Sequence, residues 1–359
     1  MKKYLLLLTF LSVIGNAQIV RKYSNEFLNI GAGARGLAMG GAVISNQNDV
    51  YAPMWNPAGL TEVESDWQGA AMHAEYFESI AKYDYISFAK ALDSKDGVLG
   101  ISIVRLGVDN ILNTTQMIDS EENIDYDKIS KFSTSDYAGI ISYAFRPGGN
   151  QKLSVGINAK IVYRNIGKFA NGFGFGFDAG AIYRADSGYQ FGAMLRDATT
   201  TVNFWSINQK ELSAVVNGEE FNPAPKDKME ITMPKLNLGV SKNFEINRDL
   251  ELLPEAGLNV DFAKTAAVIS TDFASISPYL GAELSFQKMI FVRAGLNRFQ
   301  TVTDIEDLKR KVSMQPSAGI GIKYKGLTLD YAITNTGIGG SNYFSNFFSL
   351  KLDMRDFRY

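Results

Sequence analysis

The feature that most constrains this chain is a strict alternation of apolar and polar side chains in segments of about ten residues, a length that suits membrane-crossing strands. The cleanest segment, residues 152–164, places Leu153 and Ile157 on one face and Asn158 and Lys160 on the other. Such alternation predicts a β-strand with two unlike faces, because successive side chains of a strand point to opposite sides. We expect Ile157 to face lipid, and we expect Asn158→Ser, on the opposite face, to be nearly silent.

The sequence contains fourteen such segments, an even number. They span residues 66–78, 81–92, 96–107, 135–146, 152–164, 171–184, 188–197, 231–244, 250–263, 275–286, 289–299, 313–324, 327–335 and 344–354. Tight turns such as 186–187 and 325–326 alternate with longer connections such as 108–134 and 198–230. Short turns on one side and long loops on the other are typical of outer-membrane barrels, whose short turns face the periplasm.

A soluble β-sandwich would show the same alternation, so strand length and the polar face must separate the two folds. Soluble strands usually run about 5–6 residues, whereas these run roughly twice that, close to the length that crosses a bilayer when tilted. The polar faces carry mainly Gly, Ser, Asn and Asp rather than exposed Lys and Glu. We therefore predict an all-β protein in which residues 66–359 form a fourteen-stranded antiparallel transmembrane β-barrel in contact with outer-membrane lipid.

Residues 1–17 resemble a secretory signal peptide. The chain opens with Met1-Lys2-Lys3, continues with an apolar run over 4–14 and reaches the small residue Ala17, which is the order of regions in such a peptide. The apolar run is too short for a spanning helix, which needs about 20 residues. We therefore expect an exported protein, located in the outer membrane of a Gram-negative bacterium.

Residues 18–65 show neither strand alternation nor a long helical pattern, and they are rich in Gly and Ala. Small residues allow backbones to approach closely, so we expect this segment to be enclosed by the barrel as a hatch. Residues 31–36 match the G-x-G-x-x-G dinucleotide fingerprint, but that motif requires a βαβ unit and an acidic residue about 20 positions further on. The sequence lacks both, so we interpret the glycines as a close-packed turn and expect no cofactor.

The amino-terminal segment resembles the PorV/PorQ family of outer-membrane proteins, which belongs to the wider group of FadL-like barrels. The matching stretches are Phe27-Leu28-Asn29-Ile30, Ala34-Arg35-Gly36, Met39-Gly40-Gly41-Ala42 and Trp55-Asn56-Pro57-Ala58-Gly59-Leu60. The resemblance implies a FadL-like barrel of fourteen strands with a lumenal hatch, in agreement with the fourteen segments counted above. It also implies a type IX secretion role, with the translocon and the carboxy-terminal domains of cargo as partners. The alternative is a FadL-like transporter of hydrophobic small molecules.

The candidate binding residues lie in the hatch and in the lumen. Arg35 is the natural hatch partner for a carboxylate because its guanidinium offers five donors in a planar fork, although it could instead cap a loop. Asn56, Pro57 and Gly59 form a turn by their own chemistry, and only the resemblance gives them a function. The lumenal candidates carry both signs of charge and are expected to pair, because an unpaired charge in a confined space is costly. They are Arg164, Asp178, Arg184, Asp261, Glu283 and Arg293.

The connection 198–230 is expected to lie outside the cell and carries more apolar side chains than a solvated loop needs. Phe204 and Trp205 are our candidates for a protein contact, since interface hot spots are enriched in Trp. The alternative is that both side chains fold back and close the mouth of the barrel.

Composition disfavours several function classes. The chain has no Cys and a single His, His73, so thiol chemistry and His-rich zinc sites lack their residues, and any Ser-His-Asp set would depend on His73. Carboxylate catalysis by Asp261 and Glu283 stays open, but charged lumenal residues are usually structural, so we predict no enzyme. The acidic run 119–127 lacks the glycine and spacing of an EF-hand, so we expect no metal. A net charge of −2 gives no basic field for nucleic acid.

Overall fold

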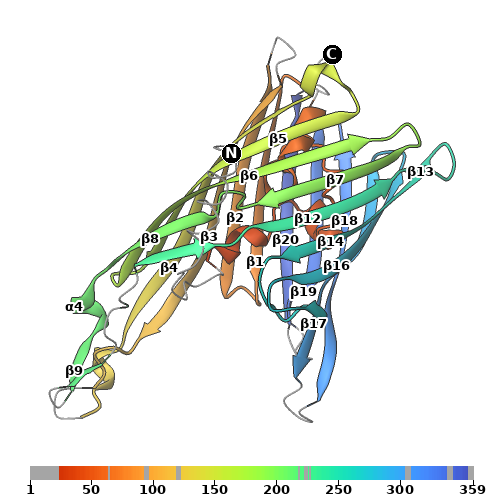
Figure 1. Ribbon diagram of the computed structural model, residues 1–359. Coiled ribbons are helices and arrows are strands. Elements are labelled where there is room, and N and C mark those ends of the chain that lie inside the picture. The colour runs from red at the N-terminus through yellow and green to blue at the C-terminus, as the bar shows by residue number, and fades with distance from the viewer. Residues whose placement is uncertain are drawn as a thin grey trace, which may run out of the picture.

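The computed structural model describes residues 24–354 except 64, 93–96, 119–122, 217–218, 222–224, 226–227, 304–308 and 338–342. The expected signal peptide at 1–17 therefore lies outside the described residues. All but two of the described strands join into one sheet that closes on itself as an antiparallel barrel (Figure 1). Among the described residues, no helix is long and apolar enough to cross a membrane.

Fourteen strands form the ring of the wall, as the sequence predicts. In order they are β1 (Trp67–Tyr76), β2 (Ala81–Ala91), β3 (Val98–Asn113), β4 (Ser130–Phe145), β5 (Leu153–Ile166), β6 (Ala170–Arg184), β7 (Tyr189–Arg196), β12 (Lys235–Lys242), β14 (Leu250–Asp261), β16 (Ser275–Phe286), β17 (Ile290–Thr303), β18 (Arg310–Tyr324), β19 (Leu327–Asn335) and β20 (Phe344–Asp353). The last strand pairs with the first, with Leu350 opposite Ala71, and this pairing closes the ring.

The connection 198–230 is partly strand, so its prediction as a loop is wrong. After a break at Asp197 and Thr200, both with positive φ, β8 (Thr201–Ile207) pairs with the outer end of β6. β11 (Met229–Thr232) pairs with β8 and leads into β12. The break interrupts the alternation along the chain, and only the pairing with β6 shows that the wall continues beyond it.

Shorter elements complete the described chain. In the wall and its connections they are η4 (Tyr126–Lys128), η5 (Pro147–Gly149), α4 (Gln209–Leu212), β9 (Ala214–Val216), β10 (Glu219–Phe221), β13 (Phe244–Glu245) and β15 (Ile269–Ser270). Before the first strand they are η2 (Glu26–Asn29), α2 (Ala34–Ala38), α3 (Ala52–Trp55) and η3 (Pro57–Glu62). These last four elements lie inside the barrel, and we call the described residues 24–63 the hatch.

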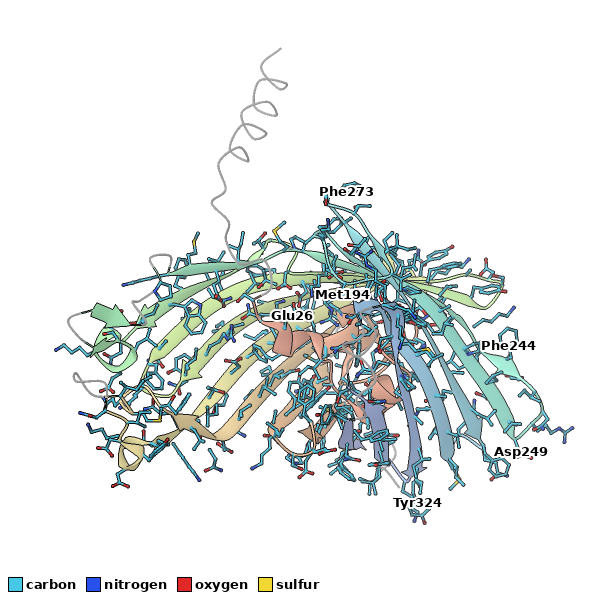
Figure 2. All side chains as sticks on the ribbon, turned by 90° about the horizontal axis from the view of Figure 1, so that it is seen from below. Glu26, Met194, Phe244, Asp249, Phe273 and Tyr324 are labelled. Carbon is cyan, nitrogen blue, oxygen red and sulfur yellow. The ribbon has the colours of Figure 1, made fainter. Side chains whose placement is uncertain are left out.

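The outside of the wall is apolar and its inside is small or polar. Ile157 is 51% exposed and Phe175 is 48% exposed, whereas Asn158 and Lys160 are buried. In Figure 2, Met194 of β7 lies within the barrel, where it is fully buried, whereas Phe273, in the connection between β14 and β16, projects away from the barrel. A water-soluble monomer rarely exposes so continuous an apolar surface, so the wall is that of a transmembrane barrel.

We predict that Ile157→Arg impairs assembly of the barrel. A charged side chain on the lipid face costs about 2–4 kcal/mol near the bilayer midplane, and Ile157 lies on that face of β5. The measurement is the fraction of detergent-extracted protein whose electrophoretic mobility shifts on heating. Ile157→Val is the matched control, and normal assembly of the Arg variant would contradict the lipid-facing placement.

Candidate functional site: the hatch and its contacts with the wall

The hatch is packed around Trp55. Its indole Nε1 donates a hydrogen bond of 2.6 Å to the Ala32 carbonyl, and its ring lies directly over Gly31 and Gly36. A Cβ on Gly31 would lie 2.3 Å from that ring, and Gly31 has a φ of +86° that other residues rarely adopt. The run that matches the dinucleotide fingerprint is therefore a close-packed turn around a tryptophan.

Asn56 and Pro57 hold the next turn against the wall. The Asn56 side chain accepts from the Ala58 N–H and caps η3, with Pro57 at its first position. Asn56 Nδ2 also donates to the Ile44 carbonyl at 2.8 Å and to the Ala181 carbonyl of β6 at 3.1 Å. Asn56 thus joins two parts of the hatch to the barrel.

Glycines on the inner face of the wall allow this close contact. A Cβ on Gly180 would lie 2.1 Å from Asn56 Oδ1, and one on Gly156 would lie 2.4 Å from the backbone of Pro57 and Ala58. Any larger residue would push the hatch away from the wall. Equivalent contacts with hatch atoms occur at Gly192, Gly281, Gly295 and Gly319. Gly59 plays the same part within the hatch, since a Cβ there would lie 2.4 Å from the Gln47 carbonyl oxygen.

Arg35 joins the hatch to a chain of charges on the wall. Its Nε donates to Glu283 at 2.9 Å, and its Nη2 donates to the side chain of Asn46 at 2.8 Å. Glu283 also accepts from Arg293 at 2.5 Å, and Arg293 donates to Asp330 at 2.7 Å. Burial lowers the pKa of Arg35, but the Glu283 carboxylate more than offsets this and raises it.

Glu255 on β14 is a hatch contact that the sequence analysis missed. Its buried carboxylate accepts from the Ile44 N–H at 2.7 Å, from the Asn46 amide at 2.7 Å and from the Ser45 hydroxyl at 2.5 Å. The Ser45 N–H is a further donor, at 3.1 Å. The sequence did carry a sign of this contact, because Glu255 is an acidic residue at an inward position of an alternating strand.

Asp49 and Lys351 form another contact between hatch and wall, with the Lys351 amine 2.7 Å from the carboxylate. Burial raises the pKa of Asp49, but Lys351 and the Tyr51 N–H lower it below its ordinary value. The ion pair therefore stabilises the docked hatch above the ordinary pKa of an aspartate, about 3.9, and that stabilisation is lost only as the pH falls through the lower folded value.

Asp197, at the break between β7 and β8, belongs to a buried charge cluster. Lys160 lies 2.6 Å from Asp178 and 2.7 Å from Asp197. Asn158 donates to Asp178 at 3.0 Å and to the Pro53 carbonyl of the hatch at 2.8 Å. Asn158→Ser would remove both bonds, so the structure favours a loss of stability at the docked hatch over the nearly silent effect expected from the sequence.

The other lumenal candidates are dispersed. Arg164 pairs with Asp136 at 3.0 Å, whereas Arg184 contacts Glu62 at the end of the hatch at 2.6 Å. Asp261 lies 3.5 Å from Lys235. It pairs in register with Ser275, whereas Glu283 pairs with Leu253 at the other end of the same two strands, so these two carboxylates do not form a catalytic pair.

Phe204 and Trp205 lie on opposite faces of β8. Phe204 is 51% exposed and stands opposite Phe173 on the apolar outside. Trp205 points inward, and the Arg164 guanidinium lies 5.2 Å from the centre of its ring. Neighbouring residues of a strand cannot share one surface, so their placement together on an outer loop was wrong.

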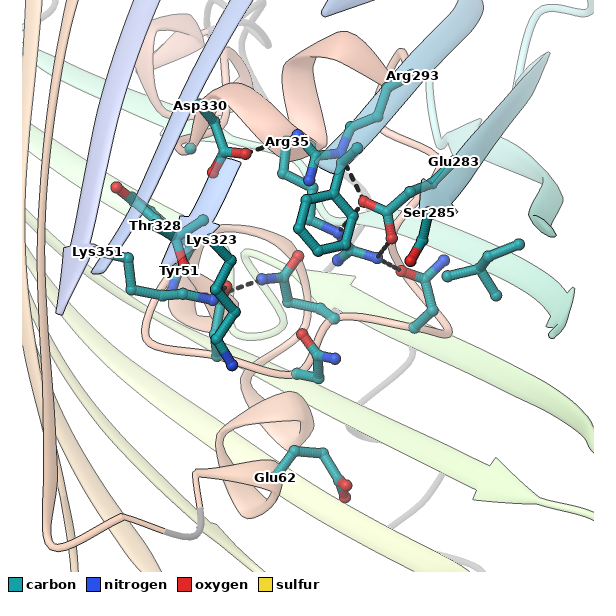
Figure 3. A pocket seen from close by; sticks show the side chains of 18 of the residues that line it. Arg35, Tyr51, Glu62, Glu283, Ser285, Arg293, Lys323, Thr328, Asp330 and Lys351 are labelled. Atoms are coloured by element: carbon teal, nitrogen blue, oxygen red, sulfur yellow. Dashed lines mark hydrogen bonds and ion pairs between the residues drawn. The ribbon is translucent and has the colours of Figure 1, made fainter. Parts of the chain in front are cut away.

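The hatch lies between a polar cavity and a cluster of packed aromatic side chains. Towards the short turns lies a polar cavity of about 400 Å³ (Figure 3). Its lining includes Arg35, Asp49, Glu283, Arg293, Lys323 and Lys351. On the other side the lumen is filled by aromatic rings, with Tyr76 packed edge-on against Phe347 at 5.2 Å and against Tyr83 at 6.3 Å.

A closed antiparallel barrel of fourteen strands with an amino-terminal segment folded into its lumen is the FadL-like fold. The Pseudomonas putida toluene transporter TodX aligns with a TM-score of 0.55 and 14% identity, over 89% of this chain and 96% of that one. The Ralstonia pickettii toluene transporter TbuX gives 0.56 and 13%, over 90% and 98%. A Pseudomonas aeruginosa FadL homologue gives 0.51 and 11%, over 90% and 98%. Comparisons of the sequence with protein-family models and with curated proteins give no match.

We predict that Glu283→Gln loosens the hatch. The change leaves both Arg35 and Arg293 short of a buried carboxylate, and removing one partner of a buried pair costs about 3–5 kcal/mol. Hydrogen exchange of the backbone amides at 34–46 should accelerate, while the wall strands stay protected.

Arg105→Met is the control, because Arg105 pairs with Asp84 at 3.2 Å on the same face as the exposed Ile103. Unchanged exchange of the hatch in Glu283→Gln would show that these charges do not hold it.

Proposed function

We propose that this chain is a non-enzymatic outer-membrane channel that passes hydrophobic small molecules, with the hatch as its gate. The observation that carries the proposal is the separation of an aromatic outer lumen from a polar cavity by a segment without strand pairing to the wall. The FadL-like fold supports it, since TodX and TbuX are named as toluene transporters. We therefore favour transport over a role in type IX secretion.

The outer lumen suits an apolar passenger. Tyr76, Tyr83 and Phe347 are buried there and offer ring faces and edges, with which aromatic molecules pack favourably. A passenger molecule would exchange its own apolar contacts for those between the rings, and no hydrogen bond would have to break.

The hatch can move without opening the wall. Its contacts with the strands are side-chain hydrogen bonds, ion pairs and glycine packing, so the ladders of the barrel stay intact when it shifts. Arg35, Asp49 and Lys351 also line the polar cavity, where water can solvate charges that separate. A shift of residues 34–49 towards the turns would open a path from the aromatic cluster to the polar cavity.

A part in type IX secretion is the second candidate, and two observations favour it. The amino-terminal stretches resemble the PorV/PorQ family, and the long hairpin of β3 and β4 exposes Leu112, Ile124 and Tyr126, at 60%, 56% and 70%. Apolar side chains outside the cell suit a protein partner such as the translocon or the carboxy-terminal domains of cargo.

Deletion of the gene separates the two candidates. Under the transport proposal, deletion lowers uptake of radiolabelled toluene, and a plasmid copy restores it, while surface display of secreted proteins is unchanged. Normal uptake together with loss of surface display would overturn the proposal in favour of type IX secretion.

We further predict that locking the hatch blocks uptake. The hydroxyls of Ser45 in the hatch and Ser241 on β12 are 2.7 Å apart, and the chain has no Cys of its own, so Ser45→Cys with Ser241→Cys can form one defined disulfide. Oxidation should abolish toluene uptake and reduction should restore it.

The control lock joins Thr61 and Ser154, whose hydroxyls are also 2.7 Å apart, at the end of the hatch that leads into the wall. This lock should leave uptake unchanged. Equal uptake with the Ser45 to Ser241 disulfide formed would mean that the hatch is not the gate.

A further inference from the structure

Strands β7, β12, β14, β16 and β17 are adjacent in the ring (Figure 1). The lipid-facing side of the wall is hollowed over these strands. A groove of about 650 Å³ crosses mainly β12, β14, β16 and β17, and a second, of about 540 Å³, crosses β6, β7, β12 and β14. Val240 and Ala256 line both grooves and are partners in register, so the two grooves meet at these residues.

The hollow comes from small side chains at outward positions. The grooves are lined by alanines, namely Ala193, Ala256, Ala282 and Ala294. By contrast, the outward positions of β5 and β6 carry large side chains such as Ile157 and Phe175. In a membrane, this apolar surface is covered by hydrocarbon, and two grooves that meet at Val240 and Ala256 offer room for two chains.

One end of the first groove carries a cation. The Lys242 amine lies 4.6 Å from the centre of the Tyr189 ring and 5.6 Å from that of Phe244, and all three residues line the groove. Among the described residues, no carboxylate lies within ion-pair distance of Lys242, whereas Lys160 is paired with two and Lys351 with one. Glu255 also lines this groove, but its carboxylate is held by hatch donors on the inner side.

The position of Lys242 fixes the leaflet. It ends β12 immediately before the short connection 243–249, and short connections face the periplasm in such barrels. Tyr and Lys at a strand end are the residues that anchor at a membrane interface. A lipid phosphate of the periplasmic leaflet would lie at this level.

We propose that the two grooves and Lys242 form a binding site for one diacyl phospholipid of the periplasmic leaflet. Each groove takes one acyl chain, Val240 and Ala256 separate the chains, and the Lys242 ammonium pairs with the phosphate. Only one layer of strand separates these chains from the hatch, since Gly192, Gly281 and Gly295 contact hatch atoms on the inner side. The bound lipid therefore lies against a part of the wall that contacts the hatch on its inner side.

The test is retention of phospholipid by the intact protein. Barrel extracted from membranes and washed extensively in detergent is examined by native mass spectrometry, and its bound lipid is titrated back with phosphatidylglycerol. We expect one bound phospholipid per barrel. Lys242→Gln should weaken it about fivefold, since a lysine near an anionic lipid surface contributes about 1 kcal/mol. Ala256→Leu, which fills the space between the chains, should also weaken it.

Two controls match these variants. Lys325 lies 5.5 Å from the centre of the Tyr324 ring at another short turn but lines neither groove, so Lys325→Gln should retain the lipid. Ala159 faces outward on β5 away from the grooves, so Ala159→Leu should also retain it. Heat-modifiable mobility shows that each variant is folded.

Three results would overturn the proposal. The first is a washed barrel with no phospholipid that binds none on titration. The second is equal retention in all four variants, which indicates lipid held without a site. The third is a change of oligomeric state in Ala256→Leu with no change in bound lipid, which would assign the grooves to a second copy of the chain.

Discussion

The structure depends on the requirement that every backbone polar group of a membrane-spanning wall finds a partner within the protein. Lipid offers no hydrogen bonds, so a spanning sheet must close on itself. The pairing of β20 with β1 meets this requirement, and the continuation of β7 as β8 meets it where the wall breaks at Asp197 and Thr200. Closure also creates a lumen, which must be filled or left open to water.

The hatch fills this lumen with irregular backbone, whose polar groups need partners that a sheet does not supply. Glu255 accepts from the Ile44 and Ser45 N–H groups, and Asn56 and Asn158 reach hatch or wall carbonyls. Buried charges such as Arg35 and Glu283 are tolerated because each is paired and hydrogen-bonded. These side-chain contacts hold the hatch in one docked position. They can break and re-form while the strand pairing of the wall stays intact.

The same strands contact the hatch with one face and lipid with the other. Inward glycines allow the hatch to approach, as Gly156 and Gly180 do, while outward residues meet lipid. Where outward residues are also small, as at Ala256 and Ala282, the wall is thin on both sides. In this region the hatch contacts the inner side of the same strands, as at Gly281 and Gly295, so a change on one face reaches the other through a single layer of backbone.

The sequence by itself determined the local properties of the chain. A period of two fixes which side chains share a face, so the fourteen strands and the opposite placement of Ile157 and Asn158 follow from the order of residues alone. The density of Gly and Ala likewise indicated an enclosed amino-terminal segment. Only the tertiary structure decided which distant residues meet. Glu255 and Lys351 became hatch contacts, Asp261 and Glu283 were kept apart, and Phe204 and Trp205 were placed on opposite sides of a strand. These outcomes depend on register around the closed ring and on how the hatch docks, and both are set by pairings between residues far apart in the chain.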